Sequence, residues 1–569
     1  MQLTQHLDEA LSSALKTERS NYLRRWQANP TAAAAALLRV VNRSAFAAMY
    51  RLGRSRLNHH AASRRADLLN LGLDLALRDY VGNSIDARGA ALSHGDNRVL
   101  QDAENFLWSC GALLTIARYS ALVRHGIGSV QFADSTYTIR LPSSQETQLE
   151  IEAIDQSASV PLAQPSDKEQ MELIRALQAW SEQDLQASAP TATTRRVVEL
   201  TLPFARYIAS THVERDLLSL PGTVGGRPLE QWRQICDITL ARALAEWNFA
   251  YWHYGPDHSI DAVGATVVNR HIDQEIEFYR LCGITDADED VIRAQSVDAE
   301  QLSRIALDGK AESHGSYFLT TGGGNLLSAP FGVVGNGYTF VQQFLRRSHF
   351  KDWDGITNER EAEFRKQLSE LLEPLGYTVK AKGKPIGKRA TKSIDTDIDA
   401  IIVDKSLRSV ALVQLKWNDS YALSISERIS RSRNVTAKAN EWIKKISNWI
   451  ERTDPSAVQA HLGLLPSECS NERPHLWVLT RYGARFNEAP DERSADADWF
   501  TWYELKMLIE RYGSGGLITS MTARLKQRSD DKRQENDRKH AAYIAANPSI
   551  SPAEVFTLPS FRVVVERDR

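Results

Sequence analysis

Two short apolar runs near residue 400 carry polar side chains where buried strands ordinarily have none. Residues 400–403 and 410–415 are apolar and partly β-branched, and a polar turn separates them, so they are predicted to form adjacent strands. Asp399 opens the first strand, and Gln414 and Lys416 close the second. Alternate residues of a strand share a face, which places Gln414 and Lys416 together. A carboxylate, an amide and an ammonium group are therefore expected to converge.

Each of these three groups suits the hydrolysis of a phosphodiester. Mg²⁺ takes oxygen ligands, keeps several waters and uses only one or two carboxylates. Asp399 and the side-chain carbonyl of Gln414 fit that description. A lysine two residues on can orient or deprotonate the attacking water and offset the developing negative charge. Lys416 is the candidate for that role.

This pattern resembles the PD-(D/E)xK nuclease superfamily, in which an acidic residue opens one strand and a (D/E/Q)xK triplet ends the next. The triplet Gln414-Leu415-Lys416 is similar to that of the Mrr-type branch. The resemblance covers roughly residues 350–515. It implies a restriction-endonuclease-like α/β domain with a central mixed sheet, dependence on Mg²⁺ or Mn²⁺, and cleavage of nucleic acid. It also implies that Asp399, Gln414 and Lys416 are catalytic, with Asp399 and Gln414 on the metal.

In this family a helix before the acidic strand supplies a further glutamate, and residues 358–376 are predicted to form that helix. Its apolar residues recur at three- and four-residue intervals, which is typical of an amphipathic helix facing a sheet: Phe364, Leu368, Leu371, Leu372 and Leu375. Glu361 is expected on the buried stripe, and Glu363 on the wet face. Glu361 is therefore the expected third catalytic and metal-binding carboxylate, although Glu363 stays open as the alternative.

The elements after Lys416 follow the order that the resemblance implies. Residues 424–452 are predicted to be a long, basic helical region, and residues 475–480 a strand. Residues 499–503 are predicted to be a late strand, followed by a helix over 504–512. This order is similar to the end of Mrr-like catalytic domains.

Positive charge gathers around the predicted site, although the whole chain is nearly neutral, with 69 basic and 71 acidic residues. Between residues 380 and 445 there are fifteen Lys and Arg against seven Asp and Glu. Six of these cations are candidate nucleic-acid contacts, four of them from a loop ahead of the acidic strand: Lys382, Lys384, Lys388, Arg389, Arg431 and Arg433. The alternative for each is a solvated surface charge.

Length and composition predict a multidomain α+β protein, because 569 residues exceed one ordinary domain. Four segments are expected: a mostly helical N-terminal domain with a small β element over 1–155, a helical accessory domain over 165–345, the nuclease-like domain over 350–515, and a charged tail over 516–569. Within the tail, residues 561–565 are expected to add an edge strand to another domain or subunit.

The four cysteines, Cys110, Cys236, Cys282 and Cys469, have no metal-binding spacing and indicate a reducing cytoplasm. The N-terminus lacks the pattern of a secretion signal, and no apolar run reaches the ~18 to 20 residues that span a bilayer. A cytoplasmic protein without a membrane partner is expected.

The expected function is a metal-dependent endonuclease acting on DNA, most readily double-stranded DNA. By fold-level analogy it would be the effector of a bacterial antiphage or restriction-like system. A homodimer and a partner protein bound by the N-terminal region are further expectations of this analogy. The rival is a catalytically inactive nuclease fold that binds nucleic acid or a partner protein, because Gln414 is a weaker metal ligand than a carboxylate.

Overall fold

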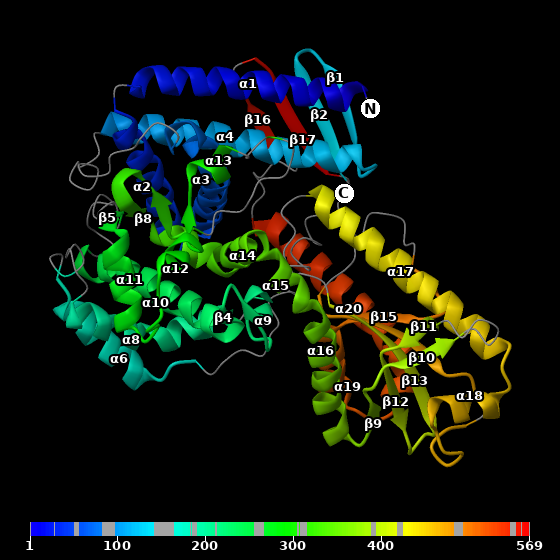
Figure 1. The fold of residues 1–569 in the computed structure, drawn as a ribbon. Helices are drawn as coiled ribbons and strands as arrows, with labels where there is room; N and C mark the ends of the chain where they lie inside the picture. Colours follow the sequence, from blue (N-terminus) through cyan, green and yellow to red (C-terminus); the bar gives the residue numbers. More distant parts are fainter. Residues whose placement is uncertain are drawn as a thin grey trace.

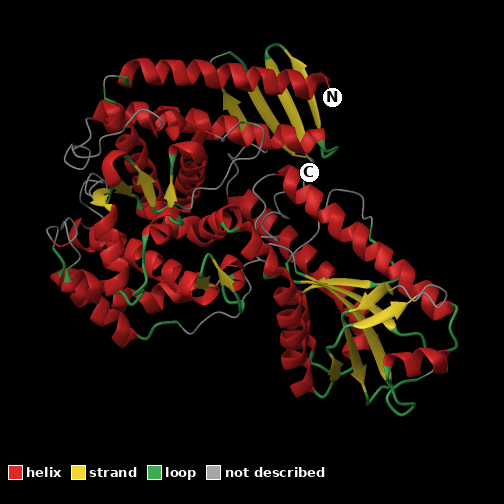
Figure 2. Ribbon diagram, in the orientation of Figure 1, coloured by secondary structure: helices red, strands yellow, loops and turns green. Residues whose placement is uncertain are grey.

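The computed structural model describes most of the 569 residues. Outside the described part lie residues 1, 28, 50–55, 82–96, 142–163, 182–183, 185–190, 211–212, 255–266, 304–306, 308–315, 388–393, 418–424, 471, 483–492, 547–553, 559 and 568–569. The chain is mixed α+β, with helices surrounding several small sheets (Figure 2). We refer to residues 2–141 as the N-terminal part, 164–355 as the middle part and 356–546 as the C-terminal part.

The N-terminal part is a bundle of long helices with a β-hairpin, as the sequence predicts. Its elements are α1 (Gln2–Trp26), α2 (Pro30–Met49), α3 (Arg56–Val81), α4 (Asn97–Arg124), β1 (Ser129–Ala133) and β2 (Thr136–Leu141). Helices α3 and α4 meet at Gly72 and Gly111, where an added Cβ would collide with the facing backbone at Leu107 and Leu68. The alanine-rich α2 is almost wholly buried, so small side chains allow the close packing.

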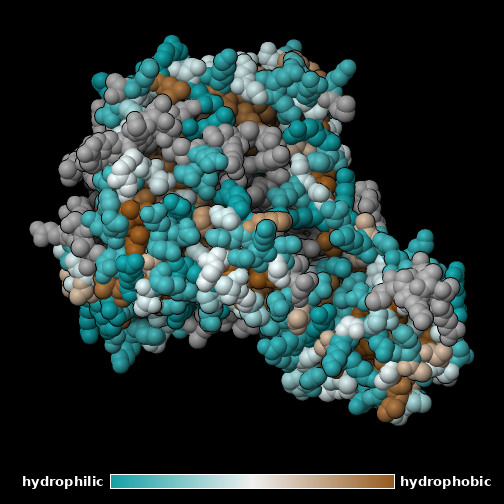
Figure 3. Space-filling view, in the orientation of Figure 1, coloured by the Kyte–Doolittle hydropathy of each residue, from teal (hydrophilic) through white to brown (hydrophobic). Residues whose placement is uncertain are grey.

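By length and composition, α2 and α4 are the two described helices that could cross a membrane, but most of each apolar stretch is buried inside the protein. Such burial is the usual placement of a core helix. The face of the molecule seen in Figure 3 is mainly hydrophilic, with apolar side chains scattered over it.

Strands from the C-terminal end of the chain complete the N-terminal sheet. The strands β16 (Glu554–Thr557) and β17 (Arg562–Arg567) extend the hairpin into a four-stranded sheet of order β1-β2-β17-β16. Strand β17 pairs with β2 in parallel, with Val564 opposite Thr138, and with β16 antiparallel. The strand expected over 561–565 is thus present, but the prediction that it is an edge strand is wrong, because β2 and β16 pair with it on its two sides (Figure 1).

The middle part is built around one long buried helix, α10, flanked by α8 and α14. Its helices are α6 (Asp167–Ala179), α8 (Ala192–Ala209), α9 (Val213–Leu217), α10 (Leu229–Tyr254), α11 (Ile272–Leu281), α12 (Glu289–Arg293), α13 (Ala299–Ser303), α14 (Pro330–Ser348) and α15 (Phe350–Gly355), with η3 (Gly322–Gly324). Its strands are β3 (Thr223–Val224), β4 (Arg227–Pro228), β5 (Val268–His271), β6 (Ser296–Val297), β7 (Phe318–Thr320) and β8 (Asn325–Ser328). The last four strands form a mixed sheet of order β5-β8-β7-β6.

The C-terminal part contains a five-stranded mixed sheet of order β15-β14-β13-β12-β9. The strands of the C-terminal part, including the two-stranded β10-β11 sheet, are β9 (Thr378–Lys380), β10 (Lys384–Gly387), β11 (Ile394–Ile398), β12 (Ala400–Asp404), β13 (Ser409–Lys416), β14 (His475–Thr480) and β15 (Asp498–Thr501). Its helices are α16 (Thr357–Leu372), η4 (Glu373–Leu375), α17 (Ile425–Glu451), α18 (Pro455–Leu462), α19 (Trp502–Tyr512) and α20 (Leu517–Ala546). Strand β12 runs antiparallel to its neighbours β9 and β13. Strand β14 runs parallel to its neighbours β13 and β15.

Helices cover both faces of this sheet, which explains why β12 and β13 are apolar throughout. Ile402 and Val413 pack into a core shared with α16 and α19, whereas Ile401 and Leu412 pack against α17 and α18 (Figure 1). The predicted helix at 358–376 is present as α16 and η4, and it ends at Gly376, whose φ of 91° favours glycine. The predicted strand pair is also present, with Ala400 opposite Val413.

The segment 516–569, expected as a charged tail, is divided between the two ends of the molecule. Leu517, Ile518 and Met521 at the start of α20 are buried in the core beside the C-terminal sheet, and β16 and β17 lie in the N-terminal sheet. A second link joins α17 to the N-terminal part, where Ser426 Oγ lies 3.1 Å from His125 Nε2. The N- and C-terminal parts are therefore connected at several points.

Candidate functional site

Asp399 lies at the end of the sheet where β13 finishes, between β11 and β12. Its backbone N–H donates to the carbonyl of Val413 at 3.0 Å, which sets Asp399 beside Gln414. Both side chains are buried, with 3% of Asp399 and 6% of Gln414 exposed. Lys416 is half-buried on the same face as Gln414, whereas Leu415 is fully buried on the opposite face. The structure thus brings the three predicted groups to one end of the strand pair.

One carboxylate oxygen of Asp399 is held by β13, and the other is more open. The backbone N–H of Leu415 donates to Oδ2 at 2.7 Å, and Nε2 of Gln414 donates to the same oxygen. The other oxygen, Oδ1, has Nη1 of Arg365 at 3.9 Å, beyond hydrogen-bond distance. Because Gln414 donates through its nitrogen, its Oε1 remains an acceptor.

Burial raises the pKa of Asp399 from 3.8 to about 6, because a charged carboxylate loses its hydration there. The Leu415 hydrogen bond and the charge of Lys416 oppose this shift, and the nearby charges of Asp397 and Glu361 add to it. A cation beside Asp399 would favour the ionised form.

Glu361 is exposed, so the prediction that it lies on the buried stripe is wrong. The buried residues of α16 recur every four positions, at Arg360, Phe364, Leu368 and Leu372, and Glu361 lies about 100° further round the helix. Arg360 occupies the position expected for Glu361. The side of α16 that carries Glu361 nevertheless faces the site, because Arg365 lies one turn later on that side and approaches Asp399.

Glu363, the alternative carboxylate, is half-buried and already has partners on its own helix. Gln367 Nε2 donates to it at 3.0 Å, and Lys366 Nζ lies 3.7 Å away. Glu361, by contrast, is near enough to raise the pKa of Asp399. Of the two, Glu361 is the carboxylate that faces the site.

The donor set suits a hydrated Mg²⁺ better than an ion enclosed by protein ligands. Among the described residues, no group of three or more His, Cys, Asp and Glu side chains could hold a metal ion. Because Gln414 Nε2 donates to Asp399 Oδ2, Asp399 Oδ1 and Gln414 Oε1 are the oxygens left for a cation, and Glu361 is near enough to raise the pKa of Asp399. Mg²⁺ accepts such a sparse set because it keeps several waters. The residues present therefore fit Mg²⁺, with waters and substrate completing its coordination.

The expected basic loop is in part a β-hairpin. Lys384 lies in β10, which pairs antiparallel with β11, and is half-buried, whereas Lys382 is exposed just before the hairpin. Lys388 and Arg389 lie outside the described residues. The hairpin runs directly into Asp399, and Lys384 pairs with Ile398 in it, so Lys384 is close to the site.

The two candidate cations of α17 differ in their surroundings. Arg431 is half-buried and donates to Glu427 at 2.8 Å, which offsets its charge. Arg433 is exposed and lies near His125, whose pKa is lowered by burial first and then by the charges of Arg433 and Arg124. Arg433 is therefore the better placed of the two to meet a polyanion.

A joint between the middle and C-terminal parts lies directly behind the site, and no local sequence pattern predicts it. Arg481 follows β14 and donates through Nε and Nη2 to Asp216 on α9, at 2.8 and 2.9 Å. Its Nη1 donates to Gln367 on α16 at 2.6 Å, and its guanidinium lies 4.6 Å from the ring centre of Trp417. The backbone N–H of Arg481 also donates to the carbonyl of Lys416 at 2.7 Å. Arg481 thus links Asp216 of the middle part to α16 and to the end of β13.

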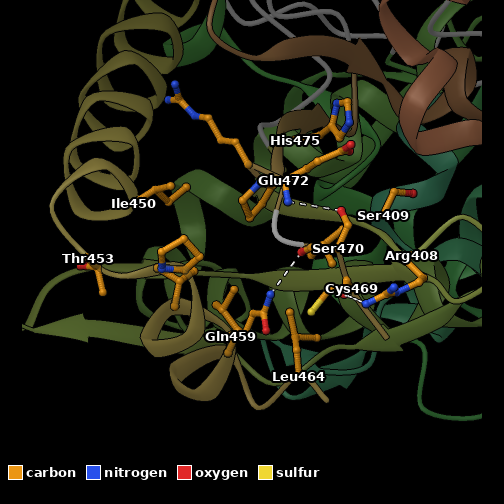
Figure 4. Close-up of a pocket in the computed structure, with 16 residues that line it drawn as sticks. Arg408, Ser409, Ile450, Thr453, Gln459, Leu464, Cys469, Ser470, Glu472 and His475 are labelled. Carbon is orange, nitrogen blue, oxygen red and sulfur yellow. Dashed lines mark hydrogen bonds between the residues drawn. The ribbon is translucent and has the colours of Figure 1, made fainter. Parts of the chain in front are cut away.

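A cavity of about 160 Å³ lies at the other end of β13 (Figure 4). Ser409 at the start of β13, Gln459 of α18 and His475 of β14 contribute to its lining. Five residues of strand separate Ser409 from Gln414, which is roughly 16 Å at the usual rise per residue. The cavity therefore does not belong to the candidate site.

No known protein family matches this chain, and no curated protein or solved structure is similar to it. The case for a function therefore comes from the residues and their geometry.

Proposed function

We propose that this chain is a metal-dependent endonuclease that hydrolyses phosphodiester bonds of DNA. The observation that carries the proposal is the convergence of Asp399, Gln414 and Lys416 at one end of β12 and β13, with Glu361 facing them from α16. The order of helix, antiparallel strands, helix and parallel strand supports it, because the PD-(D/E)xK resemblance implies that order. The C-terminal part is accordingly proposed to be a restriction-endonuclease-like domain.

In this mechanism a bound Mg²⁺ or Mn²⁺ would polarise the phosphate and lower the pKa of an attacking water. Asp399 and Gln414 would hold the ion through one oxygen each, with Glu361 reaching it directly or through a water. As the neutral amine, Lys416 would accept a proton from the attacking water; as the ammonium ion, it would orient that water and offset negative charge as the P–O bond to the leaving oxygen breaks. Leu415 contributes only its backbone N–H, which fixes the Asp399 carboxylate.

Charge around the site supports a polyanionic substrate. Lys382 precedes the hairpin, Lys384 lies in it opposite Ile398, and Arg433 is an exposed cation of α17. Phosphate contacts of this kind position a duplex without reading its sequence. We therefore propose double-stranded DNA as the substrate.

The setting of this activity is proposed on weaker grounds. All four cysteines are free thiols, which fits a reducing cytoplasm. A role as the effector of a bacterial defence system, with dimers cutting both strands, rests on fold-level analogy.

A catalytically inactive scaffold is the second candidate, and one observation favours it. The described residues contain no cluster of three acidic or imidazole ligands, and one oxygen of Asp399 is already taken by Gln414 and Leu415. Such a fold could bind nucleic acid or a partner protein without cutting.

A cleavage assay separates the two candidates. Wild-type protein is incubated with plasmid, linear duplex and single-stranded DNA, with and without Mg²⁺, alongside Lys416→Ala and Lys405→Ala. Lys405 lies in the turn at the opposite end of the strand pair, where it is exposed and pairs with Glu468, so it is a matched control. Mg²⁺-dependent cleavage by wild type and K405A, lost in a folded K416A, is the expected result. Equal cleavage by K416A, or none by wild type, would overturn the proposal.

A further inference from the structure

Arg365 is the one cation of α16 that faces the candidate site. It lies one helical turn after Glu361, its side chain is 23% exposed, and its Nη1 is 3.9 Å from Asp399 Oδ1. The other two cations of this helix point elsewhere. Arg360 is buried against the ring of Trp353, and Lys366 is 64% exposed between Glu363 and Glu370.

The Arg365 guanidinium is held near Asp399 by charge alone. Within the described part of the chain, no hydrogen bond fixes it, and 3.9 Å is too long for one to Asp399. The positive charge of Lys416 is among the main causes that shift the pKa of Asp399, and it lowers that pKa. Arg365 therefore sits at the open side of the carboxylate with its N–H groups available.

Arg365 and Lys416 approach Asp399 from two different elements, α16 and β13. A guanidinium presents its donors as a planar fork that matches two phosphate oxygens, whereas an ammonium acts as a point charge. With Lys416 directed at the attacking water, the negative charge on the non-bridging oxygens needs a separate donor. The fork on the facing helix is suitably placed.

We propose that Arg365 is a further catalytic residue, which binds the non-bridging oxygens of the scissile phosphate and stabilises their charge in the transition state. The assignment rests on the proposed nuclease function and deepens it, because it makes α16 part of the substrate contact. On one face of α16, Glu361 would then lie toward the metal and Arg365 toward the phosphate.

Three variants test the role of Arg365: Arg365→Ala, Arg365→Lys and the control Lys366→Ala. Single-turnover cleavage of a duplex is expected to fall about 10²- to 10³-fold in R365A, the usual cost of losing one such donor. R365K should recover part of that loss because it restores the charge without the fork. K366A should cleave like wild type.

Binding gives a readout that does not depend on cleavage. A labelled duplex oligonucleotide is titrated at several salt concentrations, with Ca²⁺ in place of Mg²⁺. Loss of one phosphate contact should reduce the slope of log K against log salt by about 0.9 in R365A, and K366A should keep the wild-type slope. Thermal unfolding and the variant Arg365→Gln check that the effect is not loss of fold.

The outcomes separate this inference from the function beneath it. If wild type cleaves and folded R365A cleaves equally fast with an unchanged slope, the phosphate contact is overturned and the nuclease stands. If wild type never cleaves, the proposed nuclease function is overturned. In that case the phosphate contact of Arg365 is overturned as well if R365A keeps the wild-type slope, or if wild type does not bind the duplex. A tenfold or smaller loss shared equally by R365A and K366A also overturns it.

Discussion

Two regions of this molecule bury carboxylates, and they do so in opposite ways. In the middle part, Glu246 and Glu275 are enclosed with Arg242 and Arg270, and all four side chains are buried. Arg242 Nη1 lies 2.6 Å from Glu275 and Arg270 Nη2 lies 3.0 Å from Glu246, so two positive charges balance two negative ones. At the candidate site, Asp399 is just as buried, but it is held by a backbone N–H and the neutral amide of Gln414.

Burial raises the pKa of both Glu246 and Asp399, so a raised pKa alone does not identify a site. The two differ in what surrounds the acid. Tyr317 donates to Glu246 Oε1 at 2.8 Å, and Arg242 and Arg270 lie 3.3 and 3.0 Å from the same oxygen. All of these charged side chains are buried, which makes that network structural. Around Asp399 the cations Lys416 and Arg365 are only partly buried and Glu361 is exposed. Open, incompletely paired groups are what a substrate or a metal can use.

The largest effect is expected in the structural network. Glu275→Ala leaves Arg242 buried with less counter-charge, and removing one partner of a buried pair typically costs about 3–5 kcal/mol. Denaturant unfolding measures this loss. The control Glu230→Ala removes an exposed partner of Arg233 and should change stability by less than about 0.5 kcal/mol. If E275A loses as little stability as E230A, the buried network of the middle part is not the structural element that distinguishes it from the candidate site.

The next effect is expected in how the free energy of unfolding changes with pH when Asp399 is replaced. Because the folded-state pKa of Asp399 is about 6 and its ordinary value is 3.8, the folded state holds this proton more tightly than the unfolded state. Its contribution is fully present below the ordinary pKa and is lost as pH rises through about 6. Asp399→Asn should therefore gain stability over wild type, on the order of 2 kcal/mol, between pH 4 and pH 8. A pH-independent difference between the two proteins would contradict the shift.

Breaking the joint behind the site should have a smaller effect. Asp216→Ala removes the hydrogen-bonded counter-charge of the buried Arg481, at a cost of about 2 kcal/mol in the free energy of unfolding. Because Arg481 also contacts Gln367 and Trp417, cleavage should fall too. Asp273→Ala, at an exposed position of the middle part, is the control for stability. Unchanged stability and unchanged cleavage would show that Asp216 does not support the site.

The smallest effect is expected for single surface cations. Lys382→Ala should weaken duplex binding by less than about 1 kcal/mol and alter all sequences alike, because a phosphate contact carries no sequence information. Fluorescence titrations at two salt concentrations measure this change. An effect confined to one sequence would instead indicate contact with bases.

Local pattern was sufficient to predict the strand pair, because alternation and β-branching fixed which side of β13 carries Gln414 and Lys416. It failed at Glu361, where a three- and four-residue spacing fitted two neighbouring stripes and the four-residue row through Arg360 is the buried one. Long-range contacts left no local signal. Arg481 and Asp216 are 265 residues apart, and nothing in either segment indicates the other.

The proposed function requires Asp399 to bind a divalent cation, and calorimetric titration with Mn²⁺ measures that binding. Asp395→Asn is the matched control, because Asp395 lies on the adjoining strand β11 and pairs with Lys445 rather than with the site. Wild type and D395N should bind Mn²⁺ equally at pH 7.5, and D399N should lose that binding. Binding that survives in D399N, or no binding by wild type even with duplex DNA present, would contradict the account.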